Sequence, residues 1–304
     1  MHRFRFGVNN TGASSLAEWQ EYARKAEDLG YTNLIMQDHL DRQFSPFPAL
    51  MSAAAVTTRV RLTTLVLDND FRHPAVVAKD AATVDLLTEG RLELGLGAGW
   101  LQADYEKIGL TFDPPAKRME RFKEAVAIVK GFFEEEGAFS FRGEHYTITE
   151  LEGWPPSIQQ PHPPLLIGGR QKRMLSFAAQ EADIVSISML DPRGPDLPKP
   201  PAFAEKVRWV KEAAGERYGA IELHANAGGL QVTDDAESAI AEAAQRLRID
   251  PEEVLLNPAN LIGSVDSIVE QIEAWRETCG LNYIVFPVRK MMEAAPIVAR
   301  LAGQ

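Results

Sequence analysis

Short apolar runs alternate with longer amphipathic stretches along almost the whole chain. Runs rich in Val, Ile, Leu and Phe are typical of strands buried on both faces, and apolar residues every three or four positions are typical of helices that cover a sheet. The pattern predicts strands at residues 4–8, 33–37, 61–67, 91–96, 165–169, 183–187, 221–232 and 282–286. A helical pattern follows each strand, and the last predicted helix covers residues 291–301.

Several helices carry recognisable start and stop signals. Ser15 and Glu18 have the spacing of a capping box, and Gly30 follows the expected end of that helix. Apolar residues at three- and four-residue spacing between 119 and 133 predict a long helix with one buried face. An Asp-Pro pair at 250–251, followed by two glutamates, predicts another helix start.

The alternation breaks between residues 138 and 164, where aromatic residues, Gly and Pro predict a hairpin-like excursion before the fifth strand. Residues 192–201 predict a second, irregular insertion. Eight strand–helix repeats are the pattern of a (β/α)8 TIM barrel, an α/β fold. A doubly wound open sheet is the alternative, but no Gly-x-Gly-x-x-Gly sequence follows the first strand. Because no linker divides the chain, we expect residues 1–304 to form a single domain.

Composition narrows the classes of function. The chain has 43 acidic and 32 basic residues and a net charge of −11, which disfavours a nucleic-acid-binding surface. Its single cysteine, Cys279, excludes an intrachain disulfide and a cysteine-rich zinc site. The sequence contains no apolar run typical of a signal peptide or a membrane span, so we expect a cytoplasmic protein that does not act at a membrane.

The most informative segment is the transition from strand to loop at residues 91–100. The strand runs directly into Gly97-Ala98-Gly99, where little side chain keeps a flat ligand away from the backbone, and Trp100 follows. In a parallel barrel, function is located on the loops after the carboxyl ends of the strands. A tight turn between strand and helix is the other explanation for these glycines.

Two common kinds of site find no support in the predicted loops. The His-x-x-x-His and His-x-His spacings are absent, so we expect no metal site. A Gly-x-Ser-x-Gly sequence is also absent, which disfavours serine hydrolysis.

Four segments, in this order, resemble the bacterial luciferase-like superfamily, and most of all its branch that uses the deazaflavin coenzyme F-420. They are Gln37-Asp38-His39-Leu40, Phe71-Arg72-His73-Pro74, residues 90–100, and Pro163-Pro164-Leu165-Leu166-Ile167-Gly168-Gly169. The similarity covers nearly the whole chain. It implies a (β/α)8 barrel with an excursion before strand five, and redox chemistry with a bound flavin or deazaflavin.

The resemblance places His39 and Asp38 in the catalytic centre. His39 matches a histidine at the end of strand two that lies near the deazaflavin ring in family members, where neutral imidazole can relay a proton alongside hydride transfer. Asp38 could orient the imidazole or contact the cofactor. The alternatives are a structural histidine and a solvated surface carboxylate.

The resemblance also implies a set of cofactor-binding residues. They are Thr64, Leu65, Val66, Gly97, Ala98, Gly99, Trp100, Gly168, Gly169 and Arg170. The first three match a bulge that carries a non-proline cis peptide behind the ring in family members. The last three match the corner that holds the cofactor phosphate, where backbone N–H groups at a helix start favour an anion. A glycine turn with solvated charges is the alternative at that corner.

The chain departs from the family pattern at two positions. Some deazaflavin-dependent dehydrogenases of the family carry a glutamate where Trp100 stands and a tryptophan near Gln43. Their absence puts oxidation of sugar phosphates or simple alcohols in doubt. Trp100 instead predicts an aromatic pocket mouth suited to an apolar or unsaturated substrate, although it could equally pack under the next helix.

Two charged residues alternate with apolar ones inside predicted strands. Arg5 stands between Phe4 and Phe6, and Glu93 stands between two leucines. If the apolar residues face the helices, both charges point into the barrel, where a charge needs a partner. We therefore predict a hydrogen-bonded ion pair between Arg5 and Glu93.

The leading function is a coenzyme F-420-dependent oxidoreductase that transfers a hydride between the cofactor and a C=C, C=N or C=O group of a small molecule. An FMN-dependent monooxygenase on the same barrel, using reduced flavin and oxygen, is the first alternative. A non-catalytic protein that binds flavin or deazaflavin is the second. The substrate is not readable from the residues, and a homodimer is left open.

Overall fold

The barrel strands pair in the order in which they follow one another along the chain. The computed structural model describes residues 2–134, 137–189 and 201–304. The strands are β1 (Arg5–Asn9), β2 (Asn33–Met36), β3 (Arg61–Thr64), β5 (Leu92–Gly97), β8 (Leu165–Gly169), β9 (Ile184–Ile187), β10 (Glu222–Asn226) and β13 (Leu281–Pro287). Pairings of β1 with β13 and of β3 with β5 close the ring, so these eight described strands form a parallel (β/α)8 barrel, as predicted.

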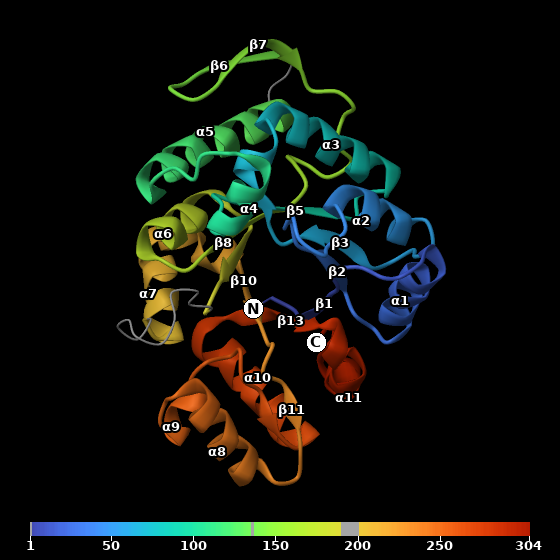
Figure 1. The fold of residues 1–304 in the computed structure, drawn as a ribbon, viewed down its shortest axis with the longest axis vertical. Helices are drawn as coiled ribbons and strands as arrows, with labels where there is room; N and C mark the ends of the chain where they lie inside the picture. The colour runs from blue at the N-terminus through green and yellow to red at the C-terminus, as the bar shows by residue number, and fades with distance from the viewer. Residues whose placement is uncertain (1, 135–136, 190–200) are drawn as a thin grey trace. The chain divides into compact units, whose positions relative to one another are not determined.

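Helices occupy the connections between the strands (Figure 1). They are α1 (Leu16–Asp28), α2 (Pro46–Ala54), α3 (Pro74–Leu87), α4 (Gln102–Ile108), α5 (Pro115–Glu134), α6 (Lys172–Glu181), α7 (Phe203–Ala214), α8 (Ala236–Leu247), α9 (Pro251–Val254), α10 (Val265–Cys279) and α11 (Met291–Leu301). Short 3-10 helices lie at η1 (Asn69–Phe71), η2 (Gly215–Ala220) and η3 (Val288–Lys290). The Glu18 N–H donates to Ser15 Oγ at 3.2 Å, which is the cap expected at the start of α1.

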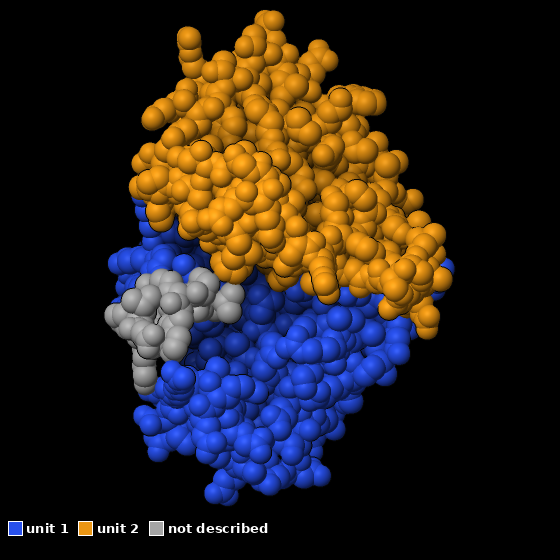
Figure 2. Space-filling view, viewed as in Figure 1, with its two compact units in different colours: residues 1–10, 22–34, 168–304 blue, residues 11–21, 35–167 orange. Residues whose placement is uncertain are grey.

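The chain forms two compact units, and neither is a continuous piece of sequence (Figure 2). Unit 1 contains residues 1–10, 22–34 and 168–304, and unit 2 contains residues 11–21 and 35–167. In unit 2, helix α3 packs against α5. In unit 1, α6 packs against α7, and β10 pairs with both β9 and β13.

The predicted excursion is a two-stranded antiparallel hairpin of β6 (Ala138–Arg142) and β7 (Thr147–Glu152) that packs against α5 (Figure 1). The ring of Phe139 occupies the space where a side chain at Gly131 would stand. Farther along, the fully buried carboxylate of Asp85 on α3 accepts hydrogen bonds from the Ile158 and Gln159 N–H groups at 2.8 and 3.1 Å. This carboxylate fixes the chain where it returns to the barrel.

The structure corrects three predicted element boundaries. Predicted strand 61–67 is divided into β3 and β4 (Leu67–Asp68) by residues 65–66. Predicted strand 221–232 ends at Asn226 before two glycines, and its last residues form β11 (Gln231–Val232), which pairs with β12 (Ile262–Gly263) outside the barrel. The helix predicted from 250 is only the single turn α9. The insertion predicted at 192–201 lies almost entirely outside the described residues.

The predicted ion pair between Arg5 and Glu93 stays a prediction, and each of the two residues has a partner within its own unit. Arg5 Nη1 donates to Glu222 Oε1 at 2.7 Å, a pair made within unit 1. Glu93, buried to 1% side-chain exposure, accepts from Arg61 Nε at 2.5 Å in unit 2. The expectation that charges at these strand positions need partners therefore holds for both residues.

Candidate active site

Three strand ends of unit 2 carry most of the residues that the sequence singles out. β2 ends two residues before Asp38, β4 ends at Asp68, and β5 ends at Gly97. Asp68 lies beside Gly97 in the parallel pairing of β4 with β5. The loops that follow these strands therefore belong to the carboxyl end of the barrel, where catalytic residues of this fold are found.

The segment between β3 and β4 has the special backbone that the resemblance implies. The peptide bond between Leu65 and Val66 is cis. Thr64 fixes the start of this segment on β5, because its hydroxyl donates to the Gly95 carbonyl at 3.0 Å and accepts the Gly95 N–H at 2.8 Å. Leu65 is buried and Val66 is half-buried.

The glycines of β5 make room for this bulge. A Cβ at Gly95 would lie 1.7 Å from the Thr64 carbonyl oxygen, and a Cβ at Gly97 would lie 2.6 Å from Val66 Cγ2. Contacts this short are not tolerated, so glycine is required at both positions. The space expected for a flat ligand at Gly97 is thus filled in part by the Val66 side chain.

Tyr105 and Arg118 both contact the loop after β5. Gly99 has φ +73°, and a Cβ there would lie 1.9 Å from the hydroxyl oxygen of Tyr105. The preceding carbonyl, of Ala98, accepts a hydrogen bond from Arg118 Nε at 3.2 Å. Arg118 in turn lies over the ring of Phe112 at 3.9 Å. The loop therefore has a fixed backbone conformation.

His39 is oriented by a carboxylate that the sequence analysis did not identify. Its Nδ1 lies 2.7 Å from Asp104 Oδ2 on α4. The Asp104 side chain is 2% exposed, and its other oxygen accepts the Leu40 N–H at 3.3 Å. Because a carboxylate only accepts, Nδ1 donates, and Nε2 is the acceptor of the neutral ring. Nε2 makes no hydrogen bond with any described residue, and the side chain is 18% exposed.

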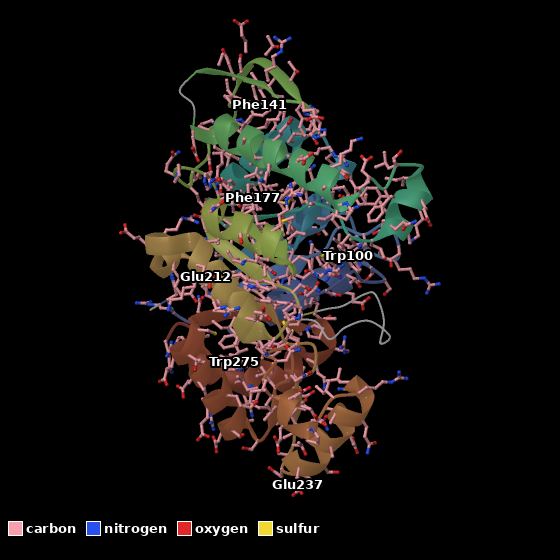
Figure 3. All side chains as sticks on the ribbon, turned by 90° about the vertical axis from the view of Figure 1, so that its left-hand side faces the viewer. Trp100, Phe141, Phe177, Glu212, Glu237 and Trp275 are labelled. Carbon is pink, nitrogen blue, oxygen red and sulfur yellow. The ribbon has the colours of Figure 1, made fainter. Side chains whose placement is uncertain are left out.

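Trp100 is the aromatic neighbour of this imidazole. The two rings meet edge to face, with centroids 5.6 Å apart and an interplanar angle of 87°. Trp100 is 42% exposed, and Figure 3 shows its side chain on the loop after β5. Packing under the following helix, the alternative considered for this residue, would bury it. His39 and Trp100 together offer one polar atom and one apolar face to a small molecule.

Asp38 does not orient His39. Its two oxygens accept hydrogen bonds from Arg72 Nη1 and Nη2, at 2.6 and 3.1 Å. One of them also accepts the Asp68 N–H at 3.0 Å. The Asp38 carboxylate is nearly buried, so this bidentate pair fixes the chain after β2 against the chain after β4. Arg72 belongs to the second family-like segment, so this pair joins the first and second segments.

A second carboxylate cluster lies beside this pair. Tyr105 donates its hydroxyl between Asp68 Oδ1 and Asp70 Oδ2, at 3.0 and 2.9 Å. Arg121 of α5 forms a bidentate pair with Asp70, at 2.7 and 2.6 Å. Burial raises the pKa of Asp68 to about 6, and the hydrogen bonds from the Asp70 N–H and from Tyr105 offset part of this effect. Asp68 therefore titrates in the weakly acidic range.

The predicted phosphate corner lies in unit 1. Gly168 and Gly169 end β8, and Arg170 lies in the turn before α6. Gln171, the N-cap residue of α6, makes no side-chain cap hydrogen bond, and the start of a helix favours an anion. A Cβ at Gly169 would meet Met174 at 2.5 Å, so this glycine is also required for packing of the helix on its strand.

Asp104 is the main functional candidate that the sequence analysis missed. Asp104 lies 65 residues after His39 in the chain. It stands in the first turn of the short helix α4, and nothing in the sequence indicates that its side chain is buried. The one available signal was an acid five residues after Gly99.

Within the described residues, no group of three or more His, Cys, Asp or Glu is arranged to hold a metal ion. The same residues contain no helix with the length and apolar character that a bilayer crossing needs.

Known proteins of two kinds are similar to this chain. A 5,10-methylenetetrahydromethanopterin reductase of Archaeoglobus fulgidus is 29% identical over 64% of this chain and 56% of its own length. An FMNH2-dependent dimethylsulfone monooxygenase of Pseudomonas putida is 27% identical over 47% of this chain and 39% of its own length. The chain spans about half the length of the curated relatives it matches.

A solved structure shows the same fold over the whole chain. The coenzyme F-420-dependent tetrahydromethanopterin reductase of Methanopyrus kandleri superposes with a TM-score of 0.76 at 21% identity, covering 99% of both chains. The family model described as luciferase-like monooxygenase matches residues 1–281. That match covers most of the sequence and agrees with the barrel and with the four family-like segments. The chain therefore belongs to the luciferase-like monooxygenase family.

Proposed function

We propose that this protein is a coenzyme F-420-dependent oxidoreductase that acts on a small organic molecule. The deazaflavin, when bound, would supply the hydride-carrying carbon for a C=C, C=N or C=O group. The observation that carries the proposal is the hydrogen bond between His39 and Asp104, which leaves the imidazole Nε2 available beside the exposed face of Trp100. The imidazole can supply the proton that accompanies hydride transfer, and Trp100 can supply an apolar surface against the substrate.

In this proposal His39 holds or delivers the proton that accompanies hydride transfer. Asp104 keeps the ring in one orientation and in one tautomer, because its second oxygen is fixed by the Leu40 N–H. Trp100 excludes water from one side of the imidazole and favours an apolar or unsaturated substrate. Asp38 positions the loop that carries His39 through its pair with Arg72 and does not touch the proton.

The residues present fit a flavin-like group. In unit 2, residues 64–66 and 97–100 have a fixed backbone, and we propose that they contact the ring. In unit 1, the uncapped start of α6 with Gly168, Gly169 and Arg170 offers backbone N–H groups and a cation, and we propose that it binds the cofactor phosphate. These assignments rest on the resemblance together with the local hydrogen bonding.

The alternative is an FMN-dependent monooxygenase. The description of the family model and the Pseudomonas putida relative both favour it. The ordered set of four sequence segments, which resembles the deazaflavin branch, favours coenzyme F-420. A non-catalytic binding protein has less support, because binding alone does not require a buried carboxylate that orients a solvent-accessible imidazole.

Oxygen dependence separates the two enzymatic functions. Deazaflavin lacks the ring nitrogen that makes reduced flavin react readily with oxygen. We therefore expect the protein to oxidise reduced coenzyme F-420 with unsaturated acceptors at the same rate with and without air. Turnover that requires reduced FMN and consumes oxygen in proportion to product would overturn the proposal in favour of the monooxygenase.

A further inference from the structure

Unit 1 contains a cavity whose lining includes none of the candidate active-site residues. Its volume is about 490 Å³, and its walls are Gly228, Gly229, Leu230, Gln231, Arg246, Leu247, Asn260, Arg289 and Lys290. The two glycines follow the end of β10, and Arg289 and Lys290 follow the end of β13. The Ala227 N–H donates to the Val285 carbonyl at 2.8 Å, which joins the chain just before the two glycines to β13.

The cavity wall is positively charged in an acidic protein. It contains two arginines and one lysine and no carboxylate, whereas the chain as a whole carries a net charge of −11. Arg246 is exposed and forms no ion pair with any described residue. These like charges would attract an anion into the cavity.

The three cationic side chains differ in how strongly neighbouring residues hold them. Arg289 is exposed and makes one long hydrogen bond, of 3.3 Å, to the Gly228 carbonyl. Lys290 Nζ is held at 2.6 Å by Glu293, whose other oxygen accepts the Val232 N–H. Lys290 is thus partly neutralised, and the two guanidinium groups carry most of the free positive charge. Guanidinium groups bind oxyanions through paired N–H donors, which makes phosphate or carboxylate the matching chemistry.

The glycine loop allows a ligand to approach the backbone. A Cβ at Gly229 would lie 2.5 Å from Asn260 Oδ1, so the loop packs tightly on that side. A Cβ at Gly228 would meet no atom within 4 Å, so this residue faces open space. In (β/α)8 barrels the loops after strands seven and eight frequently form phosphate sites, and β10 and β13 are the seventh and eighth strands of this barrel.

We propose that this cavity is an oxyanion subsite that binds a phosphate or carboxylate group of a small molecule through Arg246 and Arg289. It differs in all its residues from the α6 corner proposed for the cofactor phosphate. The inference concerns unit 1 alone and holds whichever cofactor the enzyme uses.

The test is calorimetric titration of the full chain with inorganic phosphate at low ionic strength. We expect saturable binding that weakens as NaCl is added, because free cations are screened by salt. Arg246→Gln and Arg289→Gln should each raise the phosphate Kd about tenfold, the effect of losing one charge-assisted contact. If succinate competes with phosphate at similar concentrations, the subsite binds carboxylates as well. If succinate leaves the phosphate Kd unchanged, the subsite is assigned to phosphate groups.

Arg208→Gln is the matched control. Arg208 is also an exposed arginine of unit 1, but it lies on α7 near Glu205 and Glu212. This variant should change the Kd less than twofold, and circular dichroism should show that all three variants remain folded. Phosphate binding that is equal in the wild type, Arg246→Gln and Arg289→Gln would place the anion elsewhere, for instance at α6, and overturn the proposal. So would the absence of saturable binding by the wild type.

Discussion

At the scale of single residues, the decisive contact is the one between Asp104 and His39. A buried carboxylate that accepts from Nδ1 fixes which imidazole nitrogen faces solvent, and so which nitrogen is available to a substrate. The sequence identified His39 because of its place after a strand and its family resemblance. Sequence reasoning could not identify Asp104, because Asp38, next to His39 in the chain, is an equally plausible partner of the imidazole. The structure shows that the Asp38 carboxylate instead binds Arg72.

Substitutions at His39 and Asp104 should affect turnover in a graded way. On an acceptor that the wild type reduces, His39→Ala should lower kcat by about 10²–10⁴-fold, and Asp104→Asn by a smaller factor, with little change in cofactor Kd. Imidazole 15N NMR should show the protonated nitrogen shift from Nδ1 to a mixture of tautomers in Asp104→Asn. Wild-type turnover in His39→Ala would return this residue to a structural role.

Asp68 should make folding stability depend on pH. Its pKa in the folded protein is raised to about 6 by burial, against an ordinary value of 3.8. Between these values the folded protein holds a proton that the unfolded chain has lost, so the free energy of unfolding falls as pH rises through this window. Asp68→Asn removes this titration.

The free energy of unfolding of the wild type minus that of Asp68→Asn should therefore fall by about 2–3 kcal/mol between about pH 4 and pH 7. Urea denaturation at several pH values measures this difference, and other titrating groups cancel in it. A difference that stays constant over the range would show that Asp68 has an ordinary pKa.

At the scale of elements, charged residues join neighbouring strands inside otherwise apolar layers. Arg61 on β3 reaches Glu93 on β5, and it also donates to the Leu92 carbonyl and to Gln159 in the returning excursion. One guanidinium therefore ties two strands and a loop together. The sequence shows that Glu93 alternates with leucines, but not which cation lies opposite, because that depends on strand register.

This network predicts unequal costs for removing its two charges. Arg61→Leu should lower the free energy of unfolding by about 3–5 kcal/mol, because it removes the cation that lies 2.5 Å from a buried Glu93 carboxylate oxygen. Glu93→Leu should cost clearly less, because Arg61 is 29% exposed and keeps its other acceptors. Chemical denaturation of the two variants measures the order. Glu93→Leu proving the more destabilising would contradict this account of the pair.

Helix prediction succeeded where the buried face is made of large side chains and failed where it is not. Helix α5 buries Met119, Phe122 and Val126, and its periodicity is plain in the sequence. Helix α8 buries only alanines, Ala239, Ala243 and Ala244, so its apolar periodicity is weak. The helix was therefore predicted at the nearby Asp-Pro pair, 250–251, where the structure has only the single turn α9.

At the scale of the whole molecule, the order of strands and helices was predictable and the long-range partners were not. Alternating apolar runs are enough to predict a (β/α)8 barrel, because connections in such folds join neighbouring strands. Arg5 and Glu222 lie 217 residues apart, and nothing local indicates that they meet. The same limit applies to the candidate active site, whose residues follow the ends of several strands.

The central claim is that the barrel binds a deazaflavin and uses it. The most direct test is a fluorescence titration of the purified protein with coenzyme F-420 and, separately, with FMN under identical conditions. We predict at least about tenfold tighter binding of coenzyme F-420, which corresponds to about 1.4 kcal/mol. Equal or tighter binding of FMN would contradict the account and favour the monooxygenase function.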